Sequence, residues 1–255
     1  MNTARACGDG VGMRIIDGHV HMGNNRQTKY YTLDEMWRDL HAAEADGACI
    51  FAFPEDMYRN VDLAEARIKA NEYVLEVSKT SRDLYPFYFV WNDYLLPDNL
   101  EAYRGIKWHR HADEPRYDYD DPKCFEILDR ITELRLPVLI EEEFENTVLF
   151  VKRNPALTVI IPHAGRANGG TERMEVFFNN PNIYFDTAVA PLESIKYILR
   201  KVGPERVVFG SDVSGTRTPF FNFPKVERDK LRKLDLDDEN MQLIFAGNIE
   251  RLVKA

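Results

Sequence analysis

Eight short apolar segments alternate with longer amphipathic segments along almost the whole chain, and this alternation constrains the fold more than any other feature. Strands that alternate with helices, with no linker or low-complexity tract between them, predict a parallel sheet. Several of the segments, such as "ACIFAF" and "YPFYFVW", are continuously apolar, as in strands that are covered on both faces. In a chain of 255 residues, eight such units predict a single-domain α/β protein, a closed (β/α)8 TIM barrel.

The expected elements follow the apolar pattern. The eight strands are predicted at residues 14–21, 48–53, 85–91, 104–109, 137–141, 158–163, 183–187 and 206–212. The amphipathic segments predict helices at residues 33–45, 62–80, 122–134, 145–153, 171–179, 192–201 and 237–253. The sequence "TLDE" predicts the start of the first helix, with Thr32 as the N-cap and Glu35 reaching back to it.

Charge and composition argue against several classes of partner. The formal net charge of −9 opposes binding to nucleic acid, whose phosphates lysine and arginine must neutralise. No apolar run approaches the roughly 20 residues of a membrane span, and residues 1–12 contain no apolar stretch typical of a signal peptide. We expect residues 1–12 to be a poorly ordered leader and residues 13–255 to form the barrel domain. The three cysteines are far apart and odd in number, so we expect no disulfide framework and a cytoplasmic protein.

Two histidines close the first predicted strand. His19 and His21 are two residues apart, so in a strand both side chains point to the same face, and Asp17 joins them there. Such a pair is either a polar strand end that water and backbone satisfy, or a pair of metal ligands. The motif alone leaves both readings open.

The other predicted strands end in a similar way. In a (β/α)8 barrel the C-terminal ends of all strands meet at one rim, where the functional side chains lie. Five strands bring an imidazole, an amine or a carboxylate to that rim: His19 and His21, Lys107 and His109, Glu141 and Glu143, His163, and Asp212. Each has an ordinary alternative, such as an N-cap for Asp212 or a solvated acidic run around Glu141. Together they predict a metal site.

Several motifs resemble those of the amidohydrolase-related family of metal-dependent TIM-barrel hydrolases. They are "IIDGHVHMG", "RGIKWH", "LPVLIE", "IIPHAG", "VVFGSDVSG" and "DDENMQLIFAGNIERLV", and the likeness extends from Met13 to Ala255. The resemblance implies that His19 and His21 bind a divalent metal. It implies that Asp212 binds the metal and moves a proton, and that His163 binds metal or polarises the substrate carbonyl. The family's strand-five histidine falls on Glu141, which is a departure.

The residue at position 141 bears on the metal. A carboxylate can ligate Zn²⁺, so we expect Glu141 to join the ligands and Zn²⁺ to be bound. An additional oxygen ligand also favours Mn²⁺ or Mg²⁺. In the alternative, Glu141 leaves the metal alone and contacts the substrate. In some members of the wider superfamily the lysine that corresponds to Lys107 is carbamylated and bridges two metals. We expect an unmodified Lys107, which donates to an anionic substrate group, and one metal.

The resemblance implies a hydrolase in which metal-activated water attacks a lactone, an amide or a related carbonyl of a small molecule. The catalytic residues would be Asp212, His163 and Lys107. A metal-dependent decarboxylase of an unsaturated or aromatic acid is the alternative, because the family that the chain resembles includes such enzymes, and basic groups near the rim could hold a carboxylate. The third reading is a barrel that only binds a ligand. The residues expected to contact substrate are Lys107, His109, Arg110, Glu143 and Arg166. Aromatic residues in a late loop, Phe220, Phe221 and Phe223, leave a homo-oligomer open.

Overall fold

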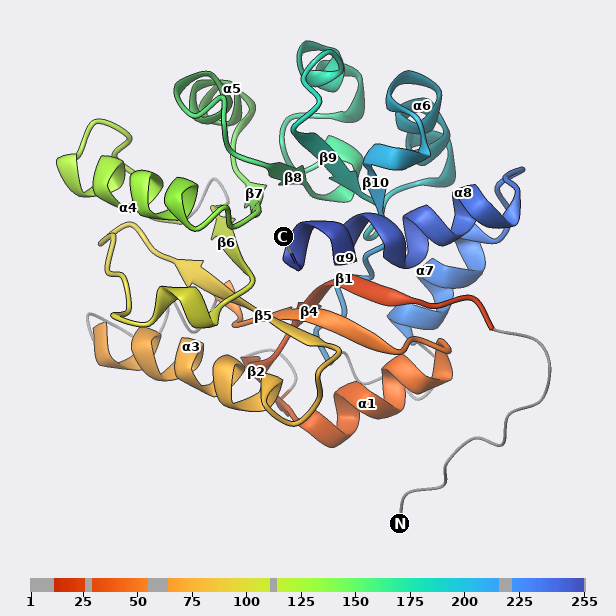
Figure 1. Cartoon of the computed structure of the whole chain (residues 1–255), viewed down its shortest axis with the longest axis horizontal. Coiled ribbons are helices and arrows are strands. Elements are labelled where there is room, and N and C mark those ends of the chain that lie inside the picture. Colours follow the sequence, from red (N-terminus) through yellow and green to blue (C-terminus); the bar gives the residue numbers. More distant parts are fainter. Residues whose placement is uncertain (1–11, 26–28, 55–63, 111–113, 216–221, 255) are drawn as a thin grey trace.

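The computed structural model describes residues 12–25, 29–54, 64–110, 114–215 and 222–254. Eight parallel strands form one sheet in sequential order, which confirms the predicted barrel (Figure 1). They are β1 (Ile16–His21), β4 (Gly47–Phe51), β5 (Leu84–Val90), β6 (Gly105–His109), β7 (Val138–Glu141), β8 (Val159–Ile161), β9 (Ile183–Asp186) and β10 (Val207–Val208). The expected leader and two of the loop aromatics, Phe220 and Phe221, lie outside the described residues, apart from Gly12.

The barrel closes between its first and last strands through the residues that follow β10. Val20 pairs with Val213 in an isolated parallel bridge. The N–H of Gly18 donates to the carbonyl of Phe209 at 2.8 Å, and the N–H of Asp212 donates to the carbonyl of His19 at 2.9 Å. This seam brings Asp212 beside the end of β1.

Helices surround the strands in an outer layer (Figure 1). They are α1 (Leu33–Ala42), α3 (Ala64–Ser78), α4 (Pro122–Glu133), α5 (Phe144–Arg153), α6 (Leu192–Val202), α7 (Phe223–Leu231) and α8 (Asp238–Gln242), and a further helix, α9 (Asn248–Val253), lies across one end of the barrel (Figure 1). The predicted capping box of α1 is present, with Thr32 accepting from the N–H of Glu35. Within the described residues, no helix is long and apolar enough to span a membrane.

Shorter elements complete the described chain. A hairpin of β2 (Gly23–Asn25) and β3 (Lys29–Tyr31) follows β1. The 3₁₀ helices are η1 (Leu100–Ala102), η2 (His163–Gly165), η3 (Thr171–Phe177) and η4 (Pro204–Arg206), and a π-helix, η5 (Leu243–Gly247), joins α8 to α9.

Two of the expected helices differ from the prediction, and one observed helix was not expected. The region 237–253 is one path through α8, η5 and α9. The expected helix at 171–179 is the 3₁₀ helix η3, whose buried residues Thr171, Met174 and Phe177 are three apart. That spacing matches three residues per turn. Helix α7 falls in a segment expected to be a loop, because "FPKVERDKL" has too few apolar residues to show helical periodicity.

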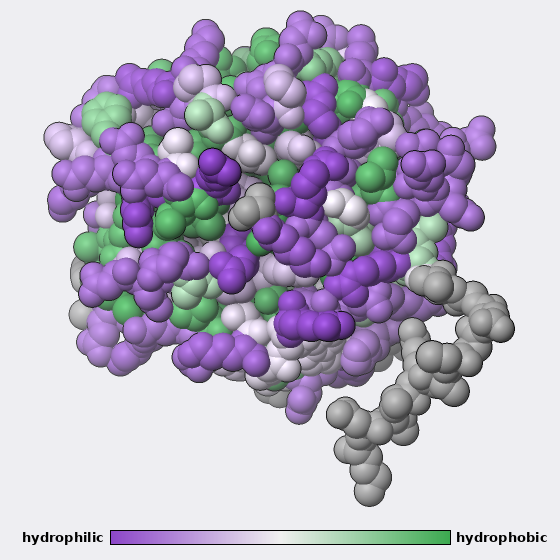
Figure 2. All heavy atoms as spheres, viewed as in Figure 1, coloured by the Kyte–Doolittle hydropathy of each residue, from purple (hydrophilic) through white to green (hydrophobic). Residues whose placement is uncertain are grey.

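Alternating strand residues divide the core into two layers. Cys49 and Phe51 of β4 point into the barrel, whereas Ala48 and Ile50 pack against the outer helices. Ile249 and Val253 of α9 join the inner layer, and Figure 1 shows α9 crossing the barrel at the end nearest the viewer. Figure 2 shows hydrophilic side chains over most of that face. Apolar side chains therefore fill the N-terminal end of the barrel, and the polar candidate residues lie at the C-terminal ends of the strands.

Candidate metal centre

The two histidines of β1 and Asp212 form a compact group. The Nε2 atom of His19 lies 3.4 Å from Oδ1 of Asp212, and the Nε2 atom of His21 lies 3.3 Å from the same oxygen. One ligand atom from each of these three residues lies within 4.8 Å of the other two. Among the described residues, this is the group of three or more histidine, cysteine, aspartate or glutamate side chains that lie close enough together to hold a metal ion. We refer to His19, His21 and Asp212 as the metal-ligand group.

The Nδ1 atoms of His19 and His21 each lie within hydrogen-bond distance of an acceptor. Nδ1 of His19 lies 2.7 Å from Oδ2 of Asp186, and Nδ1 of His21 lies 3.0 Å from the carbonyl oxygen of Ala52. Because both acceptors require a donor, Nδ1 carries the proton and the Nε2 lone pairs face Asp212. Acceptors behind the imidazoles are typical of metal-bound histidine. Burial, together with the charge of Lys107, lowers the pKa of His19 well below its usual range, so its imidazole is neutral.

Asp212 completes the group as an ionised carboxylate. Burial alone would raise its pKa, but interactions with His19, His21 and the cationic His163 hold that pKa well below its usual range. Its backbone is left-handed, with φ of 59°, which aspartate tolerates better than most residues. Two imidazole nitrogens and one carboxylate oxygen suit a divalent cation such as Zn²⁺ or Mn²⁺. The residues present therefore fit the metal that the resemblance implies.

A second group surrounds the carboxylate of Glu141. Its Oε2 atom lies 3.4 Å from Nζ of Lys107, 3.6 Å from Nε2 of His109 and 3.5 Å from Nε2 of His163. We call these four residues the Glu141 cluster. Lys107 is fully buried, and its Nζ also lies 3.4 Å from Nε2 of His19. Lys107 therefore connects the Glu141 cluster to the metal-ligand group.

The two histidines of the cluster differ in charge. Although burial lowers the pKa of His163, the carboxylates of Glu141, Asp186 and Asp212 raise it to about 10. His163 is therefore cationic at neutral pH. Burial lowers the pKa of His109, and the carboxylates of Glu141 and Glu114 only partly oppose this. Nδ1 of His109 lies 3.1 Å from Glu114, which keeps its ring in place.

The remaining predicted substrate residues have other partners. The guanidinium of Arg110 is buried and lies 3.1 Å from Glu142 and 2.9 Å from Glu143. Glu143 is the N-cap residue of α5, and its side chain is 45% exposed. Arg166 is exposed and donates to the carbonyl of Val189 at 3.1 Å. The structure thus brings Lys107, His109, Glu141 and His163 together. Arg110, Glu143 and Arg166 are near them in the sequence, but their side chains contact other groups.

Asp186 is a residue of this region that the sequence did not predict. It is the last residue of β9, so the same strand-end rule that selected the other residues also applies to it. Burial raises the pKa of Asp186, and the charges of His163 and Lys107 oppose that rise. The carbonyl of Ala52, which holds His21, leaves no side-chain signal in a sequence.

Asp17 lies at the seam of the barrel. One of its oxygens accepts from the N–H of Ser211 at 2.9 Å and from the N–H of His19 at 3.1 Å. Its other oxygen is buried and has no hydrogen-bond partner among the described residues, and burial raises the pKa of Asp17 to about 7. Asp17 thus ties β1 to the segment that carries Asp212.

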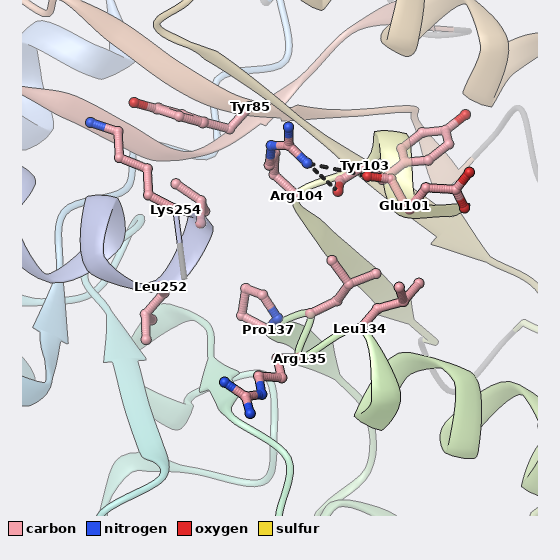
Figure 3. A pocket seen from close by; sticks show the side chains of 11 residues that line it. Tyr85, Glu101, Tyr103, Arg104, Leu134, Arg135, Pro137, Leu252 and Lys254 are labelled. Atoms are coloured by element: carbon pink, nitrogen blue, oxygen red, sulfur yellow. Dashed lines mark hydrogen bonds between the residues drawn. The ribbon is translucent and has the colours of Figure 1, made fainter. Parts of the chain in front are cut away.

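A separate hollow lies at the opposite end of the barrel. Its volume is about 410 Å³, and its lining includes Arg104 and Pro137, which precede β6 and β7. Figure 3 shows Arg104 turned towards the backbone, where it donates to the carbonyls of Glu101 and Tyr103. In barrels of this type the N-terminal end of the strands contributes to stability, and catalysis takes place at the other end. The hollow is therefore separate from the metal-ligand group.

Comparisons with solved structures show the same fold in proteins of low sequence identity. A protein of Acinetobacter baumannii, described as a probable 2-pyrone-4,6-dicarboxylic acid hydrolase with citric acid bound, is 15% identical, with a TM-score of 0.73 over 95% of this chain and 100% of that chain. The 5-carboxyvanillate decarboxylase of Novosphingobium aromaticivorans, bound to manganese and 4-hydroxy-3-methoxy-5-nitrobenzoic acid, is 14% identical, with a TM-score of 0.70 over 96% and 97%. The 4-oxalomesaconate hydratase of Rhodopseudomonas palustris is 18% identical, with a TM-score of 0.66 over 94% and 95%.

Sequence comparison identifies the family. No curated protein sequence matches the chain significantly. The family model described as Amidohydrolase, Amidohydro_2, matches residues 16–255, which contain every strand of the barrel and both groups described above. The chain therefore belongs to the amidohydrolase family.

Proposed function

We propose that this protein is a metal-dependent hydrolase that opens a lactone, an amide or a related carbonyl of a small molecule bearing a carboxylate. The observation that carries the proposal is the metal-ligand group, in which an ionised Asp212 lies 3.3–3.4 Å from two imidazole nitrogens whose other nitrogens are held by acceptors. Two nitrogen ligands and one oxygen ligand favour Zn²⁺, with Mn²⁺ as the second choice.

The side chains divide the chemistry between them. A divalent ion held by the group supplies Lewis acidity and lowers the pKa of water. Asp212, which is ionised at neutral pH, takes the proton from the attacking water and returns it to the leaving group. His163 is cationic and donates from Nε2 to the carbonyl oxygen as negative charge develops there. Lys107 holds a carboxylate of the substrate through Nζ.

Decarboxylation of an aromatic or unsaturated acid is the second candidate, and a specific observation favours it. Lys107 and His163 both lie within 3.5 Å of Glu141 and beside the metal-ligand group, so two cationic side chains are available to hold a carboxylate during loss of CO₂. Structural neighbours include a 5-carboxyvanillate decarboxylase and a 2,6-dihydroxybenzoate decarboxylase. Both candidates use the same ligands and differ in whether water is consumed.

One experiment separates the two reactions. The protein, purified without a histidine tag, is analysed for metal and incubated in ¹⁸O-water with 2-pyrone-4,6-dicarboxylate, 4-oxalomesaconate, 5-carboxyvanillate and 2,6-dihydroxybenzoate. We expect about one zinc per chain and a ring-opened product that contains one ¹⁸O atom. Release of CO₂ without ¹⁸O in the organic product would establish the decarboxylase instead. Absence of metal, with thermal unfolding unchanged by a chelator, would leave a barrel that only binds ligands.

A histidine of the surface provides the matched control. His41 is exposed on α1, so His41→Ala should retain the metal, whereas His21→Ala should lose it. A cytoplasmic location is part of the proposal, because Cys49 and Cys124 are both free and buried.

A further inference from the structure

We propose that Asp186 is a positioning residue that sets the tautomer of His19 and, with the same carboxylate, anchors the turn that carries His163. The inference rests on the proposed metal-ligand group, because it concerns which nitrogen of His19 is free to bind a cation. It assigns a role to a residue outside that group.

The carboxylate of Asp186 meets three donors. Oδ2 lies 2.7 Å from Nδ1 of His19 on β1. Oδ1 accepts from the N–H of His163 at 2.7 Å and from the N–H of Ala188 at 3.0 Å. Asp186 is 1% exposed, so these contacts take the place of water. A carboxylate suits this position because both of its oxygens are acceptors.

The first contact decides the protonation pattern of His19. A neutral imidazole carries one N–H, and the acceptor beside Nδ1 keeps that proton on Nδ1. The Nε2 lone pair then faces Asp212 and the Nζ atom of Lys107, each 3.4 Å away, and it is the atom of His19 that could bind a cation. With the proton on Nε2 instead, His19 would donate to Asp212 and could not bind a metal.

The second contact anchors a turn with an unusual backbone. His163 and Ala164 have backbone φ angles of 57° and 51°, which residues other than glycine rarely adopt. The N–H of His163 donates to Asp186 and so fixes the backbone of this turn, and Nδ1 of His163 donates to the carbonyl of Ala188 at 2.9 Å. Residues 186–188 therefore position one histidine of each group.

An Asp186→Asn variant separates this role from a purely structural one. Asparagine has the same shape but only one oxygen. If that oxygen accepts from the two backbone N–H groups, the amide NH₂ faces Nδ1 of His19, which must then accept. The proton of His19 moves to Nε2. Asp186→Glu keeps two acceptor oxygens and should keep the proton on Nδ1, although its longer side chain displaces the ring.

The test measures the tautomer and the metal affinity separately. Histidine side-chain ¹⁵N spectra of the metal-free full-length protein report the position of the proton, and competition with a chelator reports Zn²⁺ affinity. We expect Asp186→Asn to move the His19 proton to Nε2 and to weaken Zn²⁺ binding about 10- to 100-fold. Glu142→Gln is the control, because it also removes a fully buried negative charge but has contacts with Arg110 and Tyr119 rather than a histidine. It should leave both readouts unchanged.

Each outcome bears on one of the two proposals. A His19 proton that stays on Nδ1 in Asp186→Asn, with Zn²⁺ affinity like that of the wild type, would overturn the inference while leaving the proposed function intact. A wild-type protein that binds no Zn²⁺ or Mn²⁺ would overturn the proposed function, and the spectra would still decide the tautomer. If Asp186→Asn fails to fold, Asp186→Glu decides, and a His19 proton on Nε2 in that variant would refute the role of the carboxylate.

Discussion

Lys107→Met is the substitution that tests the proposed site most sharply. The Nζ atom of Lys107 is fully buried and lies 3.4 Å from both Glu141 and His19, and 5.0 Å from the ring centroid of Phe51. Methionine has a similar length and fills the same apolar path without a charge. The variant therefore removes the ammonium group and little of the packing.

The expected loss of activity follows from the contact that is removed. A hydrogen bond from a charged group is worth about 1.5–3 kcal/mol. At about 1.4 kcal/mol per factor of ten, kcat/KM should fall roughly 10- to 150-fold. Removing one partner of a buried ion pair costs about 3–5 kcal/mol when the other charge is left alone. Glu141 keeps the cationic His163 at 3.5 Å, so the loss of stability should lie below that range.

The assay combines three measurements on one preparation. Elemental analysis gives the number of metal ions per chain. Steady-state kinetics, with the substrate that the ¹⁸O-water experiment identifies, gives KM and kcat separately, and urea unfolding gives the free energy of unfolding. An unmodified Lys107 that holds a substrate carboxylate predicts a raised KM and an unchanged content of one metal. Lys254→Met is the control, because Lys254 is an exposed lysine at the other end of the barrel, paired with Glu250.

A carbamylated lysine would give a different result. Native protein would then contain two metals per chain, Lys107→Met would lose metal, and bicarbonate would speed the reconstitution of the wild type. That combination would refute the reasoning above, because a bridging carbamate leaves no ammonium to bind a substrate.

Three further predictions follow from the described contacts. His19→Ala and Asp212→Ala should each abolish metal binding, measured by elemental analysis, while circular dichroism shows a folded barrel; loss of folding in both would contradict their assignment to the site. Glu141→Ala should retain one metal per chain, because Glu141 lies outside the metal-ligand group; loss of metal would make it the ligand expected from the chemistry of its carboxylate. Burial raises the pKa of Glu250, but its pairing with Arg14 and Lys254 lowers that pKa below the usual 4.5. A carboxyl group whose pKa is lower in the folded than in the unfolded protein stabilises the folded state when the pH is above the pKa of the unfolded state. This stabilisation is lost as the pH falls through the pKa of the folded state. Glu250→Gln should therefore lower the thermal midpoint at pH 7, and its difference from wild type should shrink below about pH 4; a difference that persists in acid would exclude the ion pair as its cause.

The sequence predicted the barrel well because alternation and strand-end position are local properties. All eight expected strands are present, and the residues selected at their ends include every member of the metal-ligand group and of the Glu141 cluster. Contacts between distant residues were beyond it. His19 and Asp186 are 167 positions apart, and only the closure of the barrel brings them to 2.7 Å.

The position of Arg110 shows where local reasoning was applied incompletely. Lys107 and His109 share a strand face because they are two residues apart, so Arg110 belongs to the other face. Glu141 and Glu142 divide in the same way between the two faces. The structure pairs Arg110 with Glu142 at 3.1 Å, and it pairs Lys107 with Glu141. Strand parity, applied to Arg110 and Glu142, would have separated this buried ion pair from the candidate substrate residues. Parity does not extend to Glu143, which lies beyond β7 as the N-cap of α5 and contacts Arg110.

His163 and Asp212 were selected as strand ends, but the backbone brings them to the site in another way. Strand β8 ends at Ile161 and β10 ends at Val208, so neither residue is in its strand. Both have left-handed backbones, with φ of 57° and 59°. At His163 that conformation costs about 1–2 kcal/mol, whereas aspartate adopts it more readily, so the cost is lower at Asp212. Glycine would relieve the cost at position 163 but would remove the imidazole. The imidazole of His163 is therefore kept against a backbone preference, as expected where geometry serves chemistry and not stability.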